Sequence, residues 1–288
     1  MKYVAQDVPE DNVNISRRSP LVELATLLGG ALALLVAIYF ILGLLVDFVA
    51  PRVSFETEMR LGNAFADSFE SELNAEQKRK QAYLQDLLDQ LVKQKYGQEP
   101  HLDFKVHLNP DQTANAFAFP GGHIMVMEGL LDQAESENEV VFVLGHEMGH
   151  LHHRHNLKAL GRGLVLFVTT EAIFGGNSGI SKNMGSLMQG LQANFSRSQE
   201  LQADLSGLQS TFAHFDHVGG STDFLTRHRK DAGSSWGQYF ASHPHPDARI
   251  AQMKHTMEQL EMQEKAKKPL PDFISGELPS GNDKKVDG

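Results

Sequence analysis

The sequence of 288 residues contains no cysteine. Disulfide bridges, zinc fingers with cysteine ligands, thiolate redox centres and cysteine nucleophiles are therefore excluded. Any metal site in this chain must use histidine and carboxylate ligands, and the sequence has 14 His and 36 Asp and Glu residues to supply them.

The chain also lacks an excess of positive charge. It has 26 Lys and Arg residues against 36 Asp and Glu residues, which gives a formal net charge of -10 at pH 7. A general nucleic-acid-binding protein needs a basic surface that neutralises phosphates, so this balance argues against that class. We expect no nucleic-acid partner.

One long segment has no charge of either sign, from Leu24 to Val46. As a helix it would be about 34 Å long, enough to cross a hydrocarbon core of roughly 30 Å. It predicts one transmembrane anchor over residues 21–49, after a tail of residues 1–20, with residues 24–46 in the lipid bilayer. One alternative is a buried core helix, which would normally show a polar face. The other is a cleaved signal peptide, which would be shorter and followed by a small-residue cleavage site.

The charges beside this segment barely decide its orientation. Arg17 and Arg18 precede it and Arg52 and Arg60 follow it, so the positive-inside rule finds no clear difference. A short tail before a single N-terminal span most often stays in the cytoplasm. We therefore expect a single-pass protein of the cell inner membrane with a periplasmic domain, and the cytoplasmic face is the alternative.

The rest of the chain predicts an α+β fold that is mostly helical with a small sheet. Residues 52–100 are expected to form a helical lead-in that packs on a domain of residues 101–264. Within that domain, alternating apolar residues predict strands, and helical periodicity follows from Leu130. The polar composition of residues 265–288 predicts a disordered tail.

Two further segments of this domain stand out by their composition. The apolar residues from Leu164 to Phe174 are too few to span a membrane, which leaves a core helix or a helix at the membrane surface. Residues 175–186 are rich in Gly, Ser and Asn, and this composition predicts a mobile loop that gates the cleft.

The residues that carry chemistry begin with His146-Glu147-Met148-Gly149-His150, an H-E-x-x-H sequence inside a predicted helix. Residues four apart lie on one helix face, so both imidazoles can reach one metal ion. Glu147 lies beside them, where a carboxylate can polarise water. The apolar residues 140–144 before the motif predict that this helix is buried.

Two histidines leave a catalytic zinc one protein ligand short, since such sites use three ligands and a water. Glu200 and Asp204 lie one helical turn apart in a second predicted helix. Glu200 would complete a site of two histidines and one glutamate, and Asp204 would accept the N–H of a ligand histidine. The alternative is an exposed helix with two solvated acids.

Four separated segments then stand in one order along the chain: residues 115–122 (NAFAFPGG), residues 146–155, residues 200–204, and His243-Pro244 with Arg249. Together they resemble the membrane-associated zinc metalloproteases that include HtpX, the CAAX prenyl protease and the mitochondrial inner-membrane quality-control protease. The resemblance covers roughly Leu102 to Gln259. It implies a zincin-type fold that binds one Zn²⁺ per chain.

The resemblance also implies a role for each matching residue. His146, His150 and Glu200 would bind zinc, and Glu147 would act as general base and then as general acid in peptide hydrolysis. By its position His243 would stabilise the oxyanion, although His245 is a competing candidate.

Two supporting roles follow from the same resemblance. Asp204 and Arg249 would hold the site in place. The segment from Ala116 to Met127 would be an edge strand over the cleft, and substrate backbone would pair with it as an added strand. The residues expected to bind substrate are Asn115, Ala116, Phe117 and Ala118.

Such backbone pairing needs an extended peptide and gives little side-chain selectivity. We therefore expect a membrane-anchored zinc endopeptidase that degrades unfolded or damaged proteins. The alternatives are a membrane-anchored binding or chaperone protein on an inactive protease fold, and an aminopeptidase of the same zinc class. The oligomeric state is unknown from the sequence.

Overall fold

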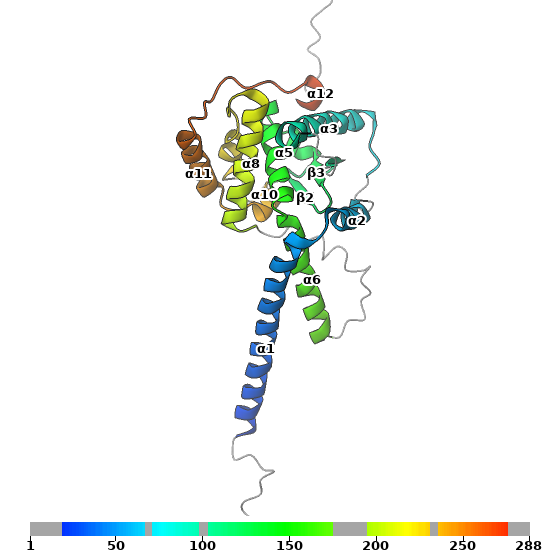
Figure 1. Cartoon of the computed structure of the whole chain (residues 1–288), viewed down its shortest axis with the longest axis vertical. Helices are drawn as coiled ribbons and strands as arrows, with labels where there is room; N and C mark the ends of the chain where they lie inside the picture. The colour runs from blue at the N-terminus through cyan, green and yellow to red at the C-terminus, as the bar shows by residue number, and fades with distance from the viewer. Residues whose placement is uncertain (1–18, 67–70, 98–102, 175–194, 231–235, 276–288) are drawn as a thin grey trace, which may run out of the picture.

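The structure is a computed structural model that describes residues 19–66, 71–97, 103–174, 195–230 and 236–275. A long helix leads away from a domain in which helices surround a small sheet, as Figure 1 shows. This arrangement agrees with the predicted α+β class. The elements are α1 (Pro20–Val49), η1 (Ala50–Arg52), α2 (Phe55–Ala66), α3 (Ala75–Tyr96), β1 (Lys105–Asn109), β2 (Ala116–Phe119), β3 (His123–Met127), α4 (Glu128–Leu131), α5 (Glu137–His152), α6 (His155–Phe174), α8 (Arg197–Phe215), α9 (Asp223–His228), α10 (Gly237–Ser242), α11 (Pro246–Gln259) and α12 (Asp272–Ser275).

The three strands form one sheet in the order β1-β3-β2, with β1 parallel and β2 antiparallel to β3. The segment expected to be an edge strand is therefore two strands, and only β2 lies at an edge. Gly121 and Gly122 connect them, with φ angles of 92° and 89° that side-chain-bearing residues rarely adopt.

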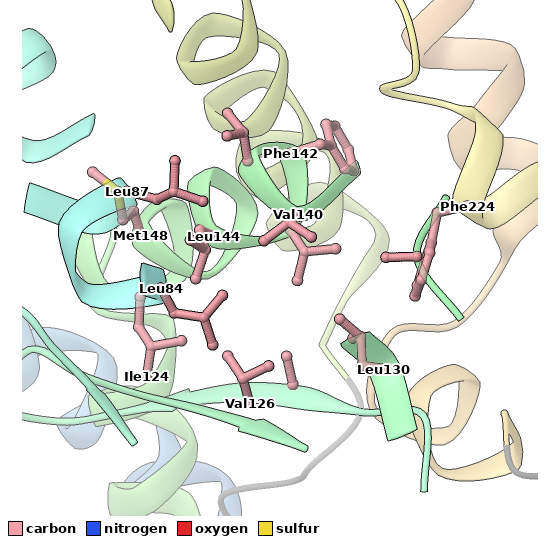
Figure 2. Close-up of a cluster of buried hydrophobic side chains, with 14 of the residues drawn as sticks. Leu84, Leu87, Ile124, Val126, Leu130, Val140, Phe142, Leu144, Met148 and Phe224 are labelled. Carbon is pink, nitrogen blue, oxygen red and sulfur yellow. The ribbon is translucent and has the colours of Figure 1, made fainter. Parts of the chain in front are cut away.

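The core lies between the sheet and α5. Ile124 and Val126 of β3 point toward Leu84 of α3 and toward Val140 and Leu144 of α5, as Figure 2 shows. Every residue of α5 from Glu137 to Leu151 is buried, so the predicted burial of this helix is confirmed. Helical structure does not run on from Leu130 without a break, because Ser136 caps a new helix by accepting a hydrogen bond from the Glu139 amide.

The helix α1 contains no buried residue and extends away from the domain (Figure 1). Its 30 residues make it about 45 Å long. By length and composition alone, Pro20–Arg52 is a helical segment that can cross a membrane.

The end of α1 is bound to the corner between α5 and α6. Arg154 has a left-handed φ of 55° at this corner, and its guanidinium donates to the carbonyl oxygens of Ala50 and Val53 at 2.9 and 2.6 Å. About two turns further along α6, Arg162 pairs with Asp47 of α1 at 2.7 Å. The exit of the apolar helix is thus attached to the chain just after the H-E-x-x-H motif.

Residues 164–174 belong to α6, which runs beside α1 outside the domain (Figure 1). Leu164 is 49% exposed. This position does not fit the core-helix alternative for the segment. The predicted gating loop of residues 175–186 and the N-terminal tail, apart from its last two residues, lie outside the described residues.

The prediction of a disordered tail from Lys265 is wrong for residues 265–275. The carbonyl of Lys268 accepts from the Glu137 amide at 3.0 Å, and the Lys268 amide donates to Asn138 at 2.9 Å. Ile274 of α12 is fully buried in the core. Because the segment buries one apolar residue and pairs its backbone with α5, its polar composition did not reveal its order.

We expect Lys80→Met to lower the free energy of unfolding by about 3 kcal/mol. Lys80 of α3 is buried and its ammonium lies 2.7 Å from the carboxylate of Glu128 in α4. Loss of the cation would leave that carboxylate with only the amide of Gln77, at 2.9 Å. Denaturant unfolding in detergent measures the change.

The double variant Lys80→Met, Glu128→Gln is the control and should recover much of the lost stability, because the two other carboxylates near Lys80, Glu76 and Asp132, are exposed to solvent. Burial opposes ionisation of Glu128, but Lys80 and Gln77 lower its pKa below the ordinary 4.5. The stability that ionised Glu128 contributes is therefore present above pH 4.5 and lost as the pH falls through the lowered pKa. An equal stability of wild type and Lys80→Met at neutral pH would contradict this account.

Candidate metal centre

The H-E-x-x-H residues lie on α5 with both histidines on one face. Nε2 of His146 lies 3.1 Å from Nε2 of His150. Both side chains are fully buried, and so is Glu147. The spacing of four residues therefore brings two nitrogen ligands to one point, as the sequence predicts.

The helix α8 brings two carboxylates to the same point. Ser196 and Gln199 form a reciprocal capping box that begins the helix, which puts Glu200 in its first turn. Oxygens of Glu200 lie 3.7 Å from His146 Nε2 and 3.5 Å from His150 Nε2. One turn later, Asp204 Oδ1 lies 3.0 Å from Nδ1 of His146. Both acids are buried, so the alternative of an exposed acidic helix is excluded.

Glycines on α5 allow α8 to come this close. A Cβ at Gly149 would lie 2.7 Å from Cβ of Ser206 and 2.9 Å from Cα of Ala203. A Cβ at Gly145 would lie 2.6 Å from Cβ of Ser210. Real Cβ atoms do not approach so closely, so the distance between the two ligand helices depends on these glycines.

His243 joins the same cluster at the end of α10. Its Nδ1 lies 3.3 Å from Nε2 of His146 and 3.2 Å from Oε1 of Glu200. Its Nε2 lies 3.6 Å from Oε1 of Glu147. His245, the competing candidate, is exposed and forms the N-cap of α11 with a left-handed φ of 63°. Of the two histidines, the structure brings only His243 to the cluster.

Arg249 of α11 is a buried cation that contacts both carboxylates of α8. Its guanidinium lies 2.5 Å from Asp204 and 2.8 Å from Glu200. Burial would raise the pKa of each acid, but the charge of Arg249 holds the pKa of Glu200 well below its usual range and lowers that of Asp204. Both acids therefore stay ionised in the interior.

Burial shifts the pKa values of the carboxylate and the histidines in opposite directions. It raises the pKa of Glu147 and lowers the pKa of His150 well below its usual value. Burial also opposes protonation of His243, but Glu200 and Glu147 raise its pKa overall. His150 is thus held neutral, which is the form that binds metals.

The strand β2 contacts Glu147 directly. The amide of Ala118 donates to Oε2 of Glu147 at 2.8 Å, and the carbonyl of Ala118 accepts from the side chain of Asn156. All four residues of β2 are buried. The predicted edge strand is next to the site, but the backbone N–H and C=O of Ala118 are already hydrogen-bonded to Glu147 and Asn156.

Three other residues at the site were not assigned a role from the sequence. The Phe195 ring packs against His150 with centroids 4.0 Å apart and a tilt of 31°, and the Tyr239 ring lies 4.8 Å from that of His243. His155 contacts His150 at 3.1 Å, and burial lowers the pKa of His155 to about 4. The signals for His155 were its place in the family-like segment of residues 146–155 and its proximity to the motif along the chain. No signal pointed to the two aromatic residues.

The cluster fits a metal ion by its donors and by its unpaired polar atoms. Ligand atoms of His146, His150, Glu200 and His243 all lie within 4.8 Å of one another. Among the described residues, Glu147 Oε1 and His243 Nε2 are buried without a hydrogen-bond partner. Buried polar groups are rarely left unpaired, so the site suits a bound ion and the polar ligands that come with it.

We expect Gly149→Ala to weaken metal binding and to destabilise the protein by roughly 1–3 kcal/mol, as overpacking of a core does. The added methyl group would push α8 away from α5 and move Glu200 with it. Metal titration and thermal unfolding measure both effects. Gly43→Ala in α1 is the control, because nothing lies within 4 Å of its added Cβ. Unchanged metal affinity in Gly149→Ala would contradict the role given to the close packing.

Comparison with known proteins identifies the family. The chain is 29% identical to the mitochondrial metalloendopeptidase OMA1 of Arabidopsis thaliana over 50% of this chain and 29% of that protein. It is 26% identical to the beta-barrel assembly-enhancing protease of Yersinia pestis over 54% of this chain and 35% of that protein. It is 35% identical to the metalloprotease LoiP of Escherichia coli over 36% of this chain and 42% of that protein.

These alignments cover well under half of the length of each relative. The model of peptidase family M48, however, matches residues 78–257, which is more than half of this chain and contains every residue of the cluster. The predicted family resemblance is confirmed: the chain belongs to peptidase family M48.

Proposed function

We propose that this protein is a membrane-anchored, zinc-dependent endopeptidase that hydrolyses unfolded or damaged proteins. The observation that carries the proposal is the buried cluster of His146, His150 and Glu200 beside the carboxylate of Glu147. Donors of nitrogen and oxygen in this ratio suit zinc, and membership of a peptidase family supports the reaction.

In this proposal His146, His150 and Glu200 hold one Zn²⁺ per chain. When bound, the ion supplies Lewis-acid polarisation of the scissile carbonyl and makes water a stronger nucleophile near neutral pH. Arg249 keeps Glu200 anionic, and Asp204 accepts the Nδ1–H of His146, so the lone pair of His146 Nε2 points into the cluster.

Glu147 is proposed to accept a proton from the attacking water and to deliver it to the leaving amine. Its Oε1 has no hydrogen-bond partner among the described residues, so this oxygen is available to a water molecule. His243 Nε2 is likewise unpaired in the described part of the chain, and it lies 3.6 Å from Glu147. We assign His243 to stabilisation of the tetrahedral oxyanion.

Substrate is proposed to bind along β2 as an added strand, through Asn115, Ala116, Phe117 and Ala118. The buried side-chain amide of Asn115 supports this assignment, because among the described residues neither its oxygen nor its nitrogen has a hydrogen-bond partner. The Ala118 amide is bonded to Glu147, so a substrate that pairs there must take the place of this carboxylate. Backbone pairing of this kind suits extended, unfolded chains.

The names of two relatives agree with a protease that acts within protein chains. One is called a beta-barrel assembly-enhancing protease and another a mitochondrial metalloendopeptidase. We propose misfolded proteins as the substrate class of this chain, because backbone pairing along β2 suits extended, unfolded chains.

We expect Glu147→Gln to reduce cleavage of an unfolded protein by roughly 10²–10⁴-fold, because a general base is lost. The variant keeps its zinc, since Glu147 is not a ligand. Purified full-length protein with zinc, assayed on a reduced and unfolded substrate with and without chelator, measures the effect. Equal cleavage by wild type and variant would contradict the assignment. If neither cleaves although both hold zinc, the protein is better explained as a binding protein on an inactive protease fold.

The helix α1 is proposed as the membrane anchor, with residues 24–46 in the bilayer. The most apolar 18-residue segment of this helix has a mean hydropathy of 2.7, and no residue of that segment is buried in the structure. Since α6 runs beside α1 from the Arg162–Asp47 pair onward, we also place the start of α6 at the membrane surface. The proposed location of the protease domain is the periplasmic side of the inner membrane.

The absence of cysteine makes this orientation simple to test. A single cysteine in place of exposed Lys254 of α11 should react with a membrane-impermeant thiol reagent in cells with a permeabilised outer membrane. The cysteine-free wild type is the control for background labelling. Labelling only after lysis of the inner membrane would place the domain on the cytoplasmic face instead.

A further inference from the structure

His150 contacts a second histidine through the ring nitrogen that faces away from the metal-type cluster. Its Nε2 lies inside the cluster, 3.1 Å from His146 Nε2, and its Nδ1 lies 3.1 Å from Nδ1 of His155. On its other side, Nε2 of His155 lies 3.0 Å from Oε1 of Gln202. His150 and His155 are 0% and 2% exposed. These contacts form a continuous hydrogen-bond network from the cluster to Gln202 of α8.

The side-chain amide of Gln202 sets the direction of each hydrogen bond in this network. The amide oxygen of Gln202 can only accept, so Nε2 of His155 is the donor to it. A neutral imidazole has one N–H, and therefore Nδ1 of His155 carries a lone pair and accepts the Nδ1–H of His150. The remaining nitrogen of His150, Nε2, then has its lone pair directed into the cluster.

The two cluster histidines on α5 are thus held by different groups. His146 donates to the carboxylate of Asp204, which Arg249 neutralises. Within the described part of the chain no carboxylate pairs with Nδ1 of His150, which contacts the imidazole of His155 instead. Phe195 packs on His150 with ring centroids 4.0 Å apart and also touches His155, so the pair is covered by an apolar ring.

The position of His155 is set by the corner that precedes it. Arg154 turns the chain in a left-handed conformation and binds the carbonyls of Ala50 and Val53. His155 is the first residue of α6, directly after this turn. The ring of His155 therefore reaches back to His150 from a fixed point of the backbone.

We infer that His155 is a positioning residue for His150: it accepts the Nδ1 proton of His150, and Gln202 holds His155 in the tautomer that can do so. The inference rests on the proposed metal site. Without His155 the Nδ1–H of His150 is buried and unpaired, and either the ring turns or its proton moves to the nitrogen that must bind the metal. Loss of an outer partner of a metal-binding histidine typically weakens metal affinity by roughly 10–100-fold.

Three substitutions separate this role from simple packing. His155→Leu keeps the bulk and removes the acceptor. His155→Asn puts an amide oxygen where Nδ1 stands and so restores an acceptor for His150. Gln202→Leu leaves His155 in place but no longer selects its tautomer. The matched control is His152→Leu, because His152 lies in the same stretch, is exposed and packs against the rings of Tyr96 and His153 rather than against the cluster.

The experiment is a zinc titration of metal-stripped, full-length protein against a chromophoric chelator. The metal-free proteins are also unfolded thermally, and their cobalt-loaded forms are compared by visible absorption. We expect the zinc Kd of His155→Leu to rise by roughly 10–100-fold and its cobalt bands to shift. His155→Asn should recover most of the affinity, Gln202→Leu should lose less than His155→Leu, and His152→Leu should match wild type.

A zinc Kd and cobalt spectrum of His155→Leu equal to those of wild type would overturn the inference, even if metal-free unfolding occurs at a lower temperature. If His155→Leu does not fold, the other two variants test the inference. Wild-type zinc affinity in Gln202→Leu, together with a loss of zinc affinity in His155→Asn, would overturn it. Failure of wild type itself to bind zinc would instead refute the proposed metal site, and the inference with it.

Discussion

Arg249 is a buried cation, and the arrangement of the cluster depends on its pairing with Asp204 and Glu200. Two carboxylates in a dry interior would otherwise repel each other and take up protons. With the guanidinium between them, Glu200 keeps the charge that a metal ligand needs and Asp204 remains an acceptor for His146. The same contacts join α11 to α8 and, through Asp204, to α5. One ion network therefore sets both the charge and the packing of the site.

The geometry around this network depends on the close approach of α5 and α8. Gly145 and Gly149 of α5 face small residues of α8, so ligands from the two helices meet within 4.8 Å. A site on buried helices holds its ligands more rigidly than one on loops, which suits a metal ion with strict distances. The corner at Arg154 then connects this rigid unit to the end of α1, although Arg154 and Ala50 are 104 residues apart in the sequence.

Local patterns predicted those parts of the fold that depend on neighbouring residues. The meeting of the two histidines of the H-E-x-x-H motif and the burial of α5 both follow from short-range rules. The order of residues 265–275 did not, because it depends on backbone pairing with Glu137 and on burial of Ile274 far away in the sequence. The edge-strand prediction was half correct for the same reason, since strand order is a tertiary property.

The sequence by itself predicted the candidate metal ligands, the family and the apolar helix, because H-E-x-x-H spacing, the later Glu and Asp, and a charge-free segment each act within one helix. Only the tertiary structure decided which distant side chains meet. It selected His243 over His245, paired Arg249 with both acids, and brought His155 and Gln202 together behind His150. These contacts join helices that are separate in the chain, and their distances arise from packing, which no local pattern encodes.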